Sequence, residues 1–385
     1  MAVSLKELTK DIDNEFGTLY LAEIDGEKSV AVFTLNTPWR VINPGVMAQM
    51  NGALDRVESD ANIAGLITYH EHGPFSNGFD LVLMRDIMQL DIAAAEQQVA
   101  GILTQGQQLF DRLYTFPKPT VAAIGGWCVG GGYELALGHT YLMGADNTNI
   151  DDPFKPWTFK LQLPEVKHVG LIPGWNGIPA LLRRTMARKT AGKQGTELKK
   201  AYDAVMKTTV EPMVLNGYGP DNAETAVKRG YIDEAVQRDF AANGNNGALL
   251  EAAIYKTLDL ADSFTANTLE PLLLQPPPAS AVAAMDAPQT PADYALRCLY
   301  STLKENGATV PETRDWATAS GLSSAGIAAL ARQPERQEHI LKYINAKVLP
   351  MLTPFSQGLA KMFAEELKIP EEEVLKRQPW LRPWG

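Results

Sequence analysis

A glycine-rich segment and two glutamates are the residues in this sequence whose types and order could carry out chemistry. Gly130, Gly131 and Gly132 follow a strand-like run at 120–124 and lead directly into a helix start. Consecutive glycines let backbone N–H groups approach a ligand with no side chain in between, and a helix N-terminus adds positive potential there. Glu134 lies in the first turn of that helix, and Glu165 follows a proline in a later loop.

The order strand, glycines, helix has several interpretations. No Gly-x-x-x-x-Gly-Lys-Ser/Thr pattern occurs, which removes a P-loop that cradles phosphates. The glycine spacing also fails Gly-x-Gly-x-x-Gly, and no βαβ unit precedes it, which argues against a dinucleotide site. A backbone oxyanion hole and a tight strand-to-helix junction without a ligand remain, and the glycine segment alone does not separate these two.

Glu134 and Glu165 are the second element of a possible active site. Two carboxyl groups that face one water molecule can take a proton from it and deliver a proton to carbon, as addition of water to a double bond requires. Each residue also has a plainer interpretation. Glu134 could be an acid favoured by the helix dipole, and Glu165 could be an exposed loop acid.

Composition narrows the class of protein. The chain has 385 residues, 45% apolar and 21% charged, as is ordinary for a globular protein. Its net charge of −10 argues against a nucleic-acid partner, which would need clustered Lys and Arg. The sequence contains no run of about 18 apolar residues, so no membrane span is predicted, and no secretion signal is expected. Cys128, Cys298 and the histidines show no metal-ligand spacing, so we expect no metal and a reducing, cytoplasmic location.

The elements that must position these residues alternate between strand and helix in the first part of the chain. Gly and Pro breakers and apolar periodicity predict helices at 46–57 and 92–113 and strands at 20–24, 29–35, 64–68, 120–124, 141–144 and 159–163. From about Arg183 onward helices dominate. We therefore predict an α/β unit at 1–237 and a helical remainder at 238–385, with linkers near 274–279 and 287–291.

Several motifs together resemble the crotonase (enoyl-CoA hydratase/isomerase) superfamily. The segment 75–81 resembles the family's motif after the second core strand, and 117–136 resembles its central motif. Residues 163–166 and 170–174 resemble the third motif. Residues 35–38 with Asn43 resemble the first loop, and 223–235 resemble the late helix. The motifs occur in the family's order over residues 15–237. The resemblance implies a ββα spiral core followed by an extended α-helical C-terminal region.

The resemblance also implies roles by motif position. The backbone N–H groups of Phe79 and Gly131 would form the oxyanion hole for a thioester carbonyl, and Glu134 and Glu165 would be the catalytic acids and bases. Residues expected to contact an acyl-CoA substrate are Arg40, Asp80, Leu81, Trp127 and Gly130. Coenzyme A would arrive with the substrate, so no separate cofactor is expected. Family members form homotrimers or hexamers, and the stripe Ile340, Tyr343, Ile344 and Val348 could serve that assembly.

Three departures from the family pattern bear on the substrate. Phe79 is bulky where simple hydratases have alanine, and Trp127-Cys128 resembles hydratase-lyases of aryl-CoA substrates. Trp175-Asn176-Gly177 replaces part of a glycine cluster, and 146–157 lengthens the stretch between the glutamates as a surface loop or a pocket cover. We therefore predict a hydro-lyase for an alicyclic or aryl-substituted enoyl-CoA. The alternatives are a C–C bond hydrolase or hydratase-lyase that opens a cyclic β-oxoacyl-CoA, an isomerase, or an inactive acyl-CoA-binding scaffold.

Overall fold

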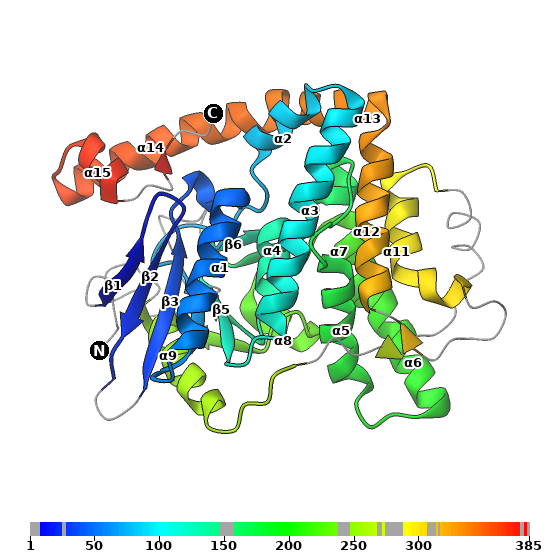
Figure 1. Cartoon of the computed structure of the whole chain (residues 1–385), viewed down its shortest axis with the longest axis horizontal. Coiled ribbons are helices and arrows are strands. Elements are labelled where there is room, and N and C mark those ends of the chain that lie inside the picture. Colours follow the sequence, from blue (N-terminus) through cyan, green and yellow to red (C-terminus); the bar gives the residue numbers. More distant parts are fainter. Residues whose placement is uncertain are drawn as a thin grey trace.

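The structure, a computed structural model, describes residues 8–24, 28–146, 158–237, 247–267, 272–273, 288–305, 313–314, 316–377 and 381–382. Figure 1 shows a sheet on one side, helices packed beside it, and the helices from the last part of the chain across the top. No helix among these residues is long and apolar enough to cross a membrane.

Within the described residues, seven strands form the main sheet, in the order β1-β2-β3-β4-β5-β7-β9. The first three strands pair antiparallel, and the pairs from β3 onward are parallel. The strand bounds are β1 Thr9–Asp13, β2 Gly17–Ala22, β3 Ser29–Leu35, β4 Ile63–Tyr69, β5 Thr120–Ile124, β7 Tyr141–Asp146 and β9 Glu234–Gln237.

Both faces of the central strands are buried, as parallel strands require. Along β3, Ala31 and Phe33 contribute to the larger core, whereas Val30 and Val32 point to a smaller cluster on the other face. Helix α9 (Gly247–Ala261) covers that second face with Leu250 and its apolar neighbours. The predicted boundary at residue 237 therefore falls just before a helix that covers the core sheet.

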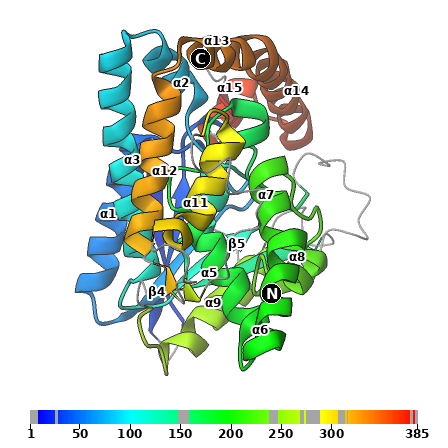
Figure 2. The same ribbon diagram turned by 90° about the vertical axis from the view of Figure 1, so that its right-hand side faces the viewer.

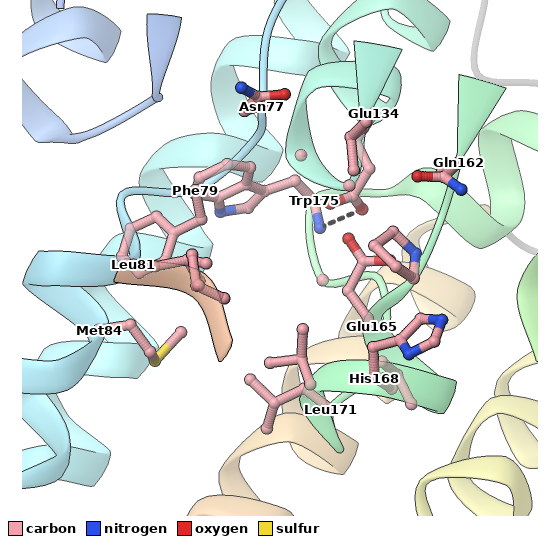
Figure 3. Close-up of a pocket in the computed structure, with 18 of the residues that line it drawn as sticks. Asn77, Phe79, Leu81, Met84, Glu134, Gln162, Glu165, His168, Leu171 and Trp175 are labelled. Carbon is pink, nitrogen blue, oxygen red and sulfur yellow. Dashed lines mark hydrogen bonds between the residues drawn. The ribbon is translucent and has the colours of Figure 1, made fainter. Parts of the chain in front are cut away.

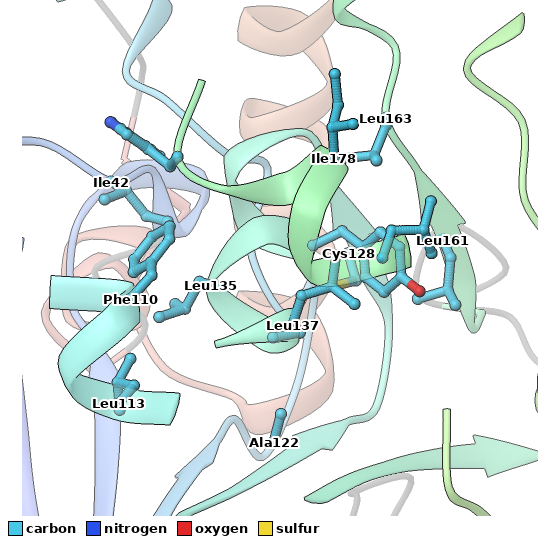
Figure 4. Close-up of a cluster of buried hydrophobic side chains, with 14 of the residues drawn as sticks. Ile42, Phe110, Leu113, Ala122, Cys128, Leu135, Leu137, Leu161, Leu163 and Ile178 are labelled. Carbon is cyan, nitrogen blue, oxygen red and sulfur yellow. The ribbon is translucent and has the colours of Figure 1, made fainter. Parts of the chain in front are cut away.

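The first face carries the helices that surround the site. Helices α1 (Pro44–Ser59) and α3 (Ile92–Tyr114) lie side by side in Figure 2. The short helix α4 (Gly131–Leu137) is buried along its whole length. Figure 4 shows its Leu135 near Phe110 of α3, and its Leu137 near Cys128 and Leu161. Packing around α4 therefore determines where its N-terminus lies.

A small parallel ribbon and further short elements complete this part of the chain. β6 (Trp127–Val129) pairs with β8 (Lys160–Gln162) in a separate two-stranded sheet. The remaining elements are η2 Pro38–Arg40, α2 Leu81–Met88, η4 Glu165–Val169, α5 Gly177–Thr190, α6 Gly195–Val205, η5 Met206–Val210, α7 Glu211–Asn216 and α8 Ala223–Arg229.

The helices of the C-terminal region pack back onto the core. The Trp39 indole N–H donates to the Ser356 hydroxyl at 2.9 Å, across 317 positions of sequence. Ile340 and Ile344 are fully buried within their own chain, so the apolar stripe there is already covered. The elements are β10 Leu272–Leu273, α11 Pro291–Glu305, β11 Thr313–Arg314, α12 Trp316–Ala331, α13 Pro334–Tyr343, η6 Ile344–Val348, α14 Leu349–Leu367 and α15 Glu371–Arg377.

The α/β architecture and the helical C-terminal region predicted from the sequence are confirmed. The strand at 120–124 and the helix starting at Ile92 lie where the sequence predicted them. Strand β1 was not predicted, because its polar residues lie at an exposed sheet edge and show no apolar alternation. Residues 147–157 of the predicted insertion at 146–157, and the linker at 274–279, lie outside the described residues.

Replacing Ile344 by alanine tests how tightly the C-terminal helices are anchored. Ile344 is fully buried, so its truncation should lower the free energy of unfolding by about 2–5 kcal/mol. Ile92→Ala is a matched control. Ile92 is 42% exposed at the start of α3, so its truncation should lower the free energy of unfolding far less. Urea denaturation followed by fluorescence measures both. Equal losses would show that the stripe is not anchored as described.

Candidate active site

A cavity of about 450 Å³ lies where the N-terminus of α4, the π-helical turn η4 and the C-terminal helices meet (Figure 3). Most of its lining is apolar, with side chains from α2, α3, α12, η6 and α14. Both predicted glutamates line it, as do Phe79, Gly131 and Trp175. A largely apolar cavity with a few convergent polar groups is the usual form of a small-molecule site.

The backbone at Phe79 presents its N–H group toward the start of α4. The neighbours of Phe79 pair with Ile42, because Ile42 N–H donates to the Gly78 carbonyl at 2.7 Å and Asp80 N–H donates to the Ile42 carbonyl at 3.0 Å. Successive N–H groups of an extended chain point to opposite sides, so the Phe79 N–H points away from Ile42. Segment 75–76 pairs in turn with β6, which leads into the glycines.

The second backbone N–H, that of Gly131, lies close by. A Cβ on Gly131 would lie 3.3 Å from the Phe79 nitrogen, and a Cβ on Gly78 would lie 2.8 Å from the Gly131 nitrogen. Gly78 also has φ +83°, a conformation that favours glycine. Gly131 begins α4, where the first N–H groups have no partner within the helix. The backbone nitrogens of Phe79 and Gly131 therefore lie close together at the start of α4.

Arg40 supports the segment that carries Phe79 and does not line the cavity. Its guanidinium is buried and donates to the Pro74 carbonyl, while its own carbonyl accepts from the Ser76 hydroxyl at 2.7 Å. Burial lowers the pKa of Arg40 to about 9. The sequence-based assignment of Arg40 to the substrate is therefore corrected: its side chain is used inside the protein, where it braces the loop.

Glu134 is held by the loop that follows Pro173. Its Oε1 accepts from the Trp175 N–H at 2.7 Å and from the Gly177 N–H at 2.9 Å. Helix α3 fixes that loop, because the Asn176 amide donates to Asp111 at 2.7 Å and the Gln107 amide donates to the Gly174 carbonyl at 2.7 Å. The direction of one carboxyl thus depends on two backbone donors and on α3 behind them.

Glu165 opens the turn η4 and turns its carboxyl toward Glu134 (Figure 3). A Cβ on Gly130 would lie 2.7 Å from Glu165 Oε1, so the carboxyl lies against the backbone at the start of α4. Its buried Oε2 has no hydrogen-bond partner among the described residues.

The two carboxyl groups titrate as an unequal pair. Burial raises the pKa of Glu134 to about 7, against the opposing effect of its backbone donors. Burial and the negative charge of Glu134 raise the pKa of Glu165 well above its usual range. Because several backbone N–H groups lower the pKa of Glu134 and its charge opposes a second charge on Glu165, we expect Glu134 to ionise first and Glu165 to keep its proton. A base and an acid can then act side by side near neutral pH.

The structure brings most of the predicted site residues together. Seven of the nine line one cavity: Phe79, Leu81, Trp127, Gly130, Gly131, Glu134 and Glu165. Asp80 does not line it. The Asp80 carboxylate instead caps α2, accepting from the N–H groups of Val82 and Leu83.

The lining residues that were not predicted include Trp175, His168, Tyr218 and Tyr343. The Trp175 ring meets Phe79 edge-on with 5.5 Å between centroids, and it lies over Gly131. Its only signal in the sequence was the departure from the glycine cluster. Tyr218 and Tyr343 come from distant segments, and no motif marks them.

Comparisons with known proteins identify relatives among enoyl-CoA hydratases. The enoyl-CoA hydratase/isomerase family model matches residues 25–193. A probable enoyl-CoA hydratase of Bacillus subtilis is 32% identical over 158 residues, which cover 41% of this chain and 54% of that protein. The chain therefore spans about half the length of that relative. A probable enoyl-CoA hydratase of Mycobacterium bovis is 26% identical over 60% of this chain and 87% of that protein.

Solved structures with a similar fold include two enzymes of this kind. An enoyl-CoA hydratase/isomerase from Xanthobacter autotrophicus has a TM-score of 0.52 at 16% identity, covering 86% of this chain and 94% of that one. The human mitochondrial delta3-delta2-enoyl-CoA isomerase has a TM-score of 0.51 at 17% identity, covering 85% and 97%. At these identities the similarity concerns the fold.

The raised pKa of Glu134 predicts a pH-dependent stability. Between an unfolded pKa of about 4.5 and a folded value of about 7, the native state binds more protons than the unfolded state. The stability contributed by the protonated carboxyl is therefore complete below the unfolded value and is lost as the pH rises through the folded one, at up to about 1.4 kcal/mol per pH unit. Glu134→Gln should abolish this loss.

Urea denaturation of both proteins at several pH values between about 5 and 8 measures the effect. The free energy of unfolding of Glu134→Gln minus that of the unsubstituted protein should rise with pH across this range. Glu338→Gln, at an exposed position of α13, should show no such trend. A flat difference for Glu134→Gln would contradict the raised pKa.

Proposed function

Since the chain belongs to the crotonase (enoyl-CoA hydratase/isomerase) superfamily, we propose that it adds water to the double bond of an enoyl-CoA thioester, or removes it. One observation carries the proposal. Two buried carboxyl groups with unequal environments face one another beside two converging backbone N–H groups. Water addition needs a base for water, an acid for carbon and a site for the charge on the thioester oxygen.

The backbone donors would act on the thioester oxygen. As water adds at Cβ, electrons move from the double bond onto that oxygen and form an enolate. The N–H groups of Phe79 and Gly131 are fixed before the reaction, so they stabilise this charge with little reorganisation. Such a donor typically lowers the activation barrier by about 3–4 kcal/mol.

The two glutamates would move the protons. The Glu134 carboxylate takes a proton from water, whose oxygen bonds to Cβ, and the protonated Glu165 delivers its proton to Cα. Glu134 then holds the proton taken from water while Glu165 is deprotonated, and transfer of that proton from Glu134 to Glu165 restores the pair. The backbone donors to Glu134 and the unpartnered Oε2 of Glu165 support this division of roles.

We also propose that the acyl group is alicyclic or aryl-substituted. Aromatic side chains surround the reacting centre, namely Phe79, Trp127 and Trp175. Branched apolar residues of α3 and α12, including Val99, Leu103 and Ile327, line the cavity further in. A cavity of about 450 Å³ has room for a ring, and flat aromatic walls suit one.

Glutamine at either glutamate tests the mechanism. Loss of a positioned acid or base typically lowers the rate about 10²–10⁴-fold, so Glu134→Gln and Glu165→Gln should each fall in that range. The double variant should lose much less than the product of the two single losses, because the two groups act on one water. Rates on crotonyl-CoA, cinnamoyl-CoA and cyclohex-1-enecarbonyl-CoA provide the measurement.

Reaction in H₂¹⁸O identifies the chemistry. Label at Cβ marks hydration, label in a new carboxylate marks ring-opening hydrolysis, and a shifted double bond without label marks isomerisation. Glu338→Gln serves as the matched control and should retain activity. Wild-type rates in both single variants would overturn the two-carboxylate mechanism.

A side chain at Gly131 should disable the oxyanion hole. The Cβ of Gly131→Val would lie 2.6 Å from the Trp175 ring and 3.3 Å from the Phe79 nitrogen, so the two backbone donors must separate. We expect turnover to fall about 10²–10³-fold while circular dichroism shows a folded protein. Gly101→Val in α3 is the control, because a Cβ there meets nothing within 4 Å. Near-normal turnover of Gly131→Val would remove this loop from the active site.

A further inference from the structure

One wall of the cavity is polar beyond the catalytic glutamates. His168 lies three positions after Glu165 on η4, Tyr218 follows α7, and Tyr343 ends α13. All three line the cavity. In Figure 3 His168 lies beside Glu165, and Leu81 and Met84 lie on the opposite side. Three distant segments thus bring hydrogen-bonding side chains to the lining of this cavity.

His168 and Tyr218 form a hydrogen-bonded pair. His168 Nε2 and the Tyr218 hydroxyl lie 3.1 Å apart, and the rings meet edge-on with 5.7 Å between centroids. The Lys167 ammonium lies 4.5 Å from the centre of the Tyr218 ring and restrains that ring further. Burial and the charge of Lys167 lower the pKa of His168, so the imidazole is neutral. Whichever group donates within the pair, the phenol oxygen can still bond a ligand.

Tyr343 places a second phenol in the lining of the cavity. Its ring packs against both the main core and the C-terminal cluster, which fixes its direction. Burial, followed by electrostatic interactions with Glu165 and Tyr218, raises the pKa of Tyr343. Tyr343 therefore offers the cavity a neutral hydroxyl.

We propose that His168, Tyr218 and Tyr343 form a polar subsite that binds a neutral oxygen, hydroxyl or oxo, carried by the acyl group beyond Cβ. The proposal rests on the function proposed above and narrows its substrate to an oxygenated acyl-CoA. We call these three residues the phenol subsite.

The chemistry of the wall selects this class of acyl group. A plain hydrocarbon would cover the phenol and imidazole groups without giving them a hydrogen-bond partner, which costs binding free energy. A carboxylate on the acyl group would bring a second negative charge into the cavity that contains the Glu165 carboxyl. It would also compete with Glu165 for the proton that Glu165 carries. A hydroxyl or oxo group satisfies the donors and brings no charge.

Binding of saturated thioesters tests the phenol subsite apart from turnover, because they contain no double bond to hydrate. Isothermal titration would compare cyclohexanecarbonyl-CoA with its 3- and 4-hydroxy and 4-oxo derivatives. One gained hydrogen bond is worth a preference of about threefold to tenfold for at least one oxygenated ester. Tyr218→Phe and Tyr343→Phe each remove one hydroxyl and should bring that ratio toward one.

Tyr255→Phe is the matched control, because Tyr255 is 59% exposed on α9 and does not line the cavity. Its ratio should equal that of the unsubstituted protein. Equal affinity of the unsubstituted protein for all the esters, or a preference that both cavity variants retain, would overturn the phenol subsite.

The two proposals fail in different ways. Turnover of enoyl-CoA esters without any preference for an oxygenated acyl group would overturn the phenol subsite and leave the hydratase intact. A preference for oxygenated saturated esters, lost in Tyr218→Phe, supports the subsite even where no enoyl-CoA is hydrated.

Discussion

The contact between the backbone at Gly78 and the backbone at Gly131 leaves no space for a side chain on either residue. A Cβ on Gly78 would lie 2.8 Å from the Gly131 nitrogen, and one on Gly131 would enter the Trp175 ring. The contact is possible because β6 pairs with the segment before Gly78 and then leads into α4, which is buried on all sides. Cavity, glutamates and aromatic walls are all arranged around this junction.

The second requirement is electrostatic. Two carboxyl groups are removed from water, which strongly disfavours a charge on either of them. The protein stabilises a charge on Glu134 by directing two N–H groups of the loop 175–177 at its carboxyl. That loop depends in turn on Gln107 and Asp111 of α3, which touch no carboxyl of the pair. The acid-base asymmetry of the site is therefore built by residues one layer behind it.

The sequence predicted the parts of the molecule that local pattern controls. The glycine segment, Glu134 and Glu165 come with strong turn and helix signals, and the buried strand at 120–124 has a simple apolar run. The sequence did not predict the positions of residues that depend on tertiary contacts. Arg40 was expected to contact the substrate, but the fold buries it against Pro74. Tyr343 reaches the cavity only because α13 packs back across the core, which no local pattern specifies.

The contribution of the C-terminal helices to the cavity has a kinetic consequence. Tyr343, Val348 and Met351 line a cavity whose other wall comes from Phe79, and the Trp39–Ser356 hydrogen bond spans 317 positions. Contacts of such large sequence separation form slowly, since the loops that they close carry a high entropic cost. The chain therefore acquires a binding-competent cavity late in folding. A ligand that binds only this finished state draws the whole chain toward it by mass action.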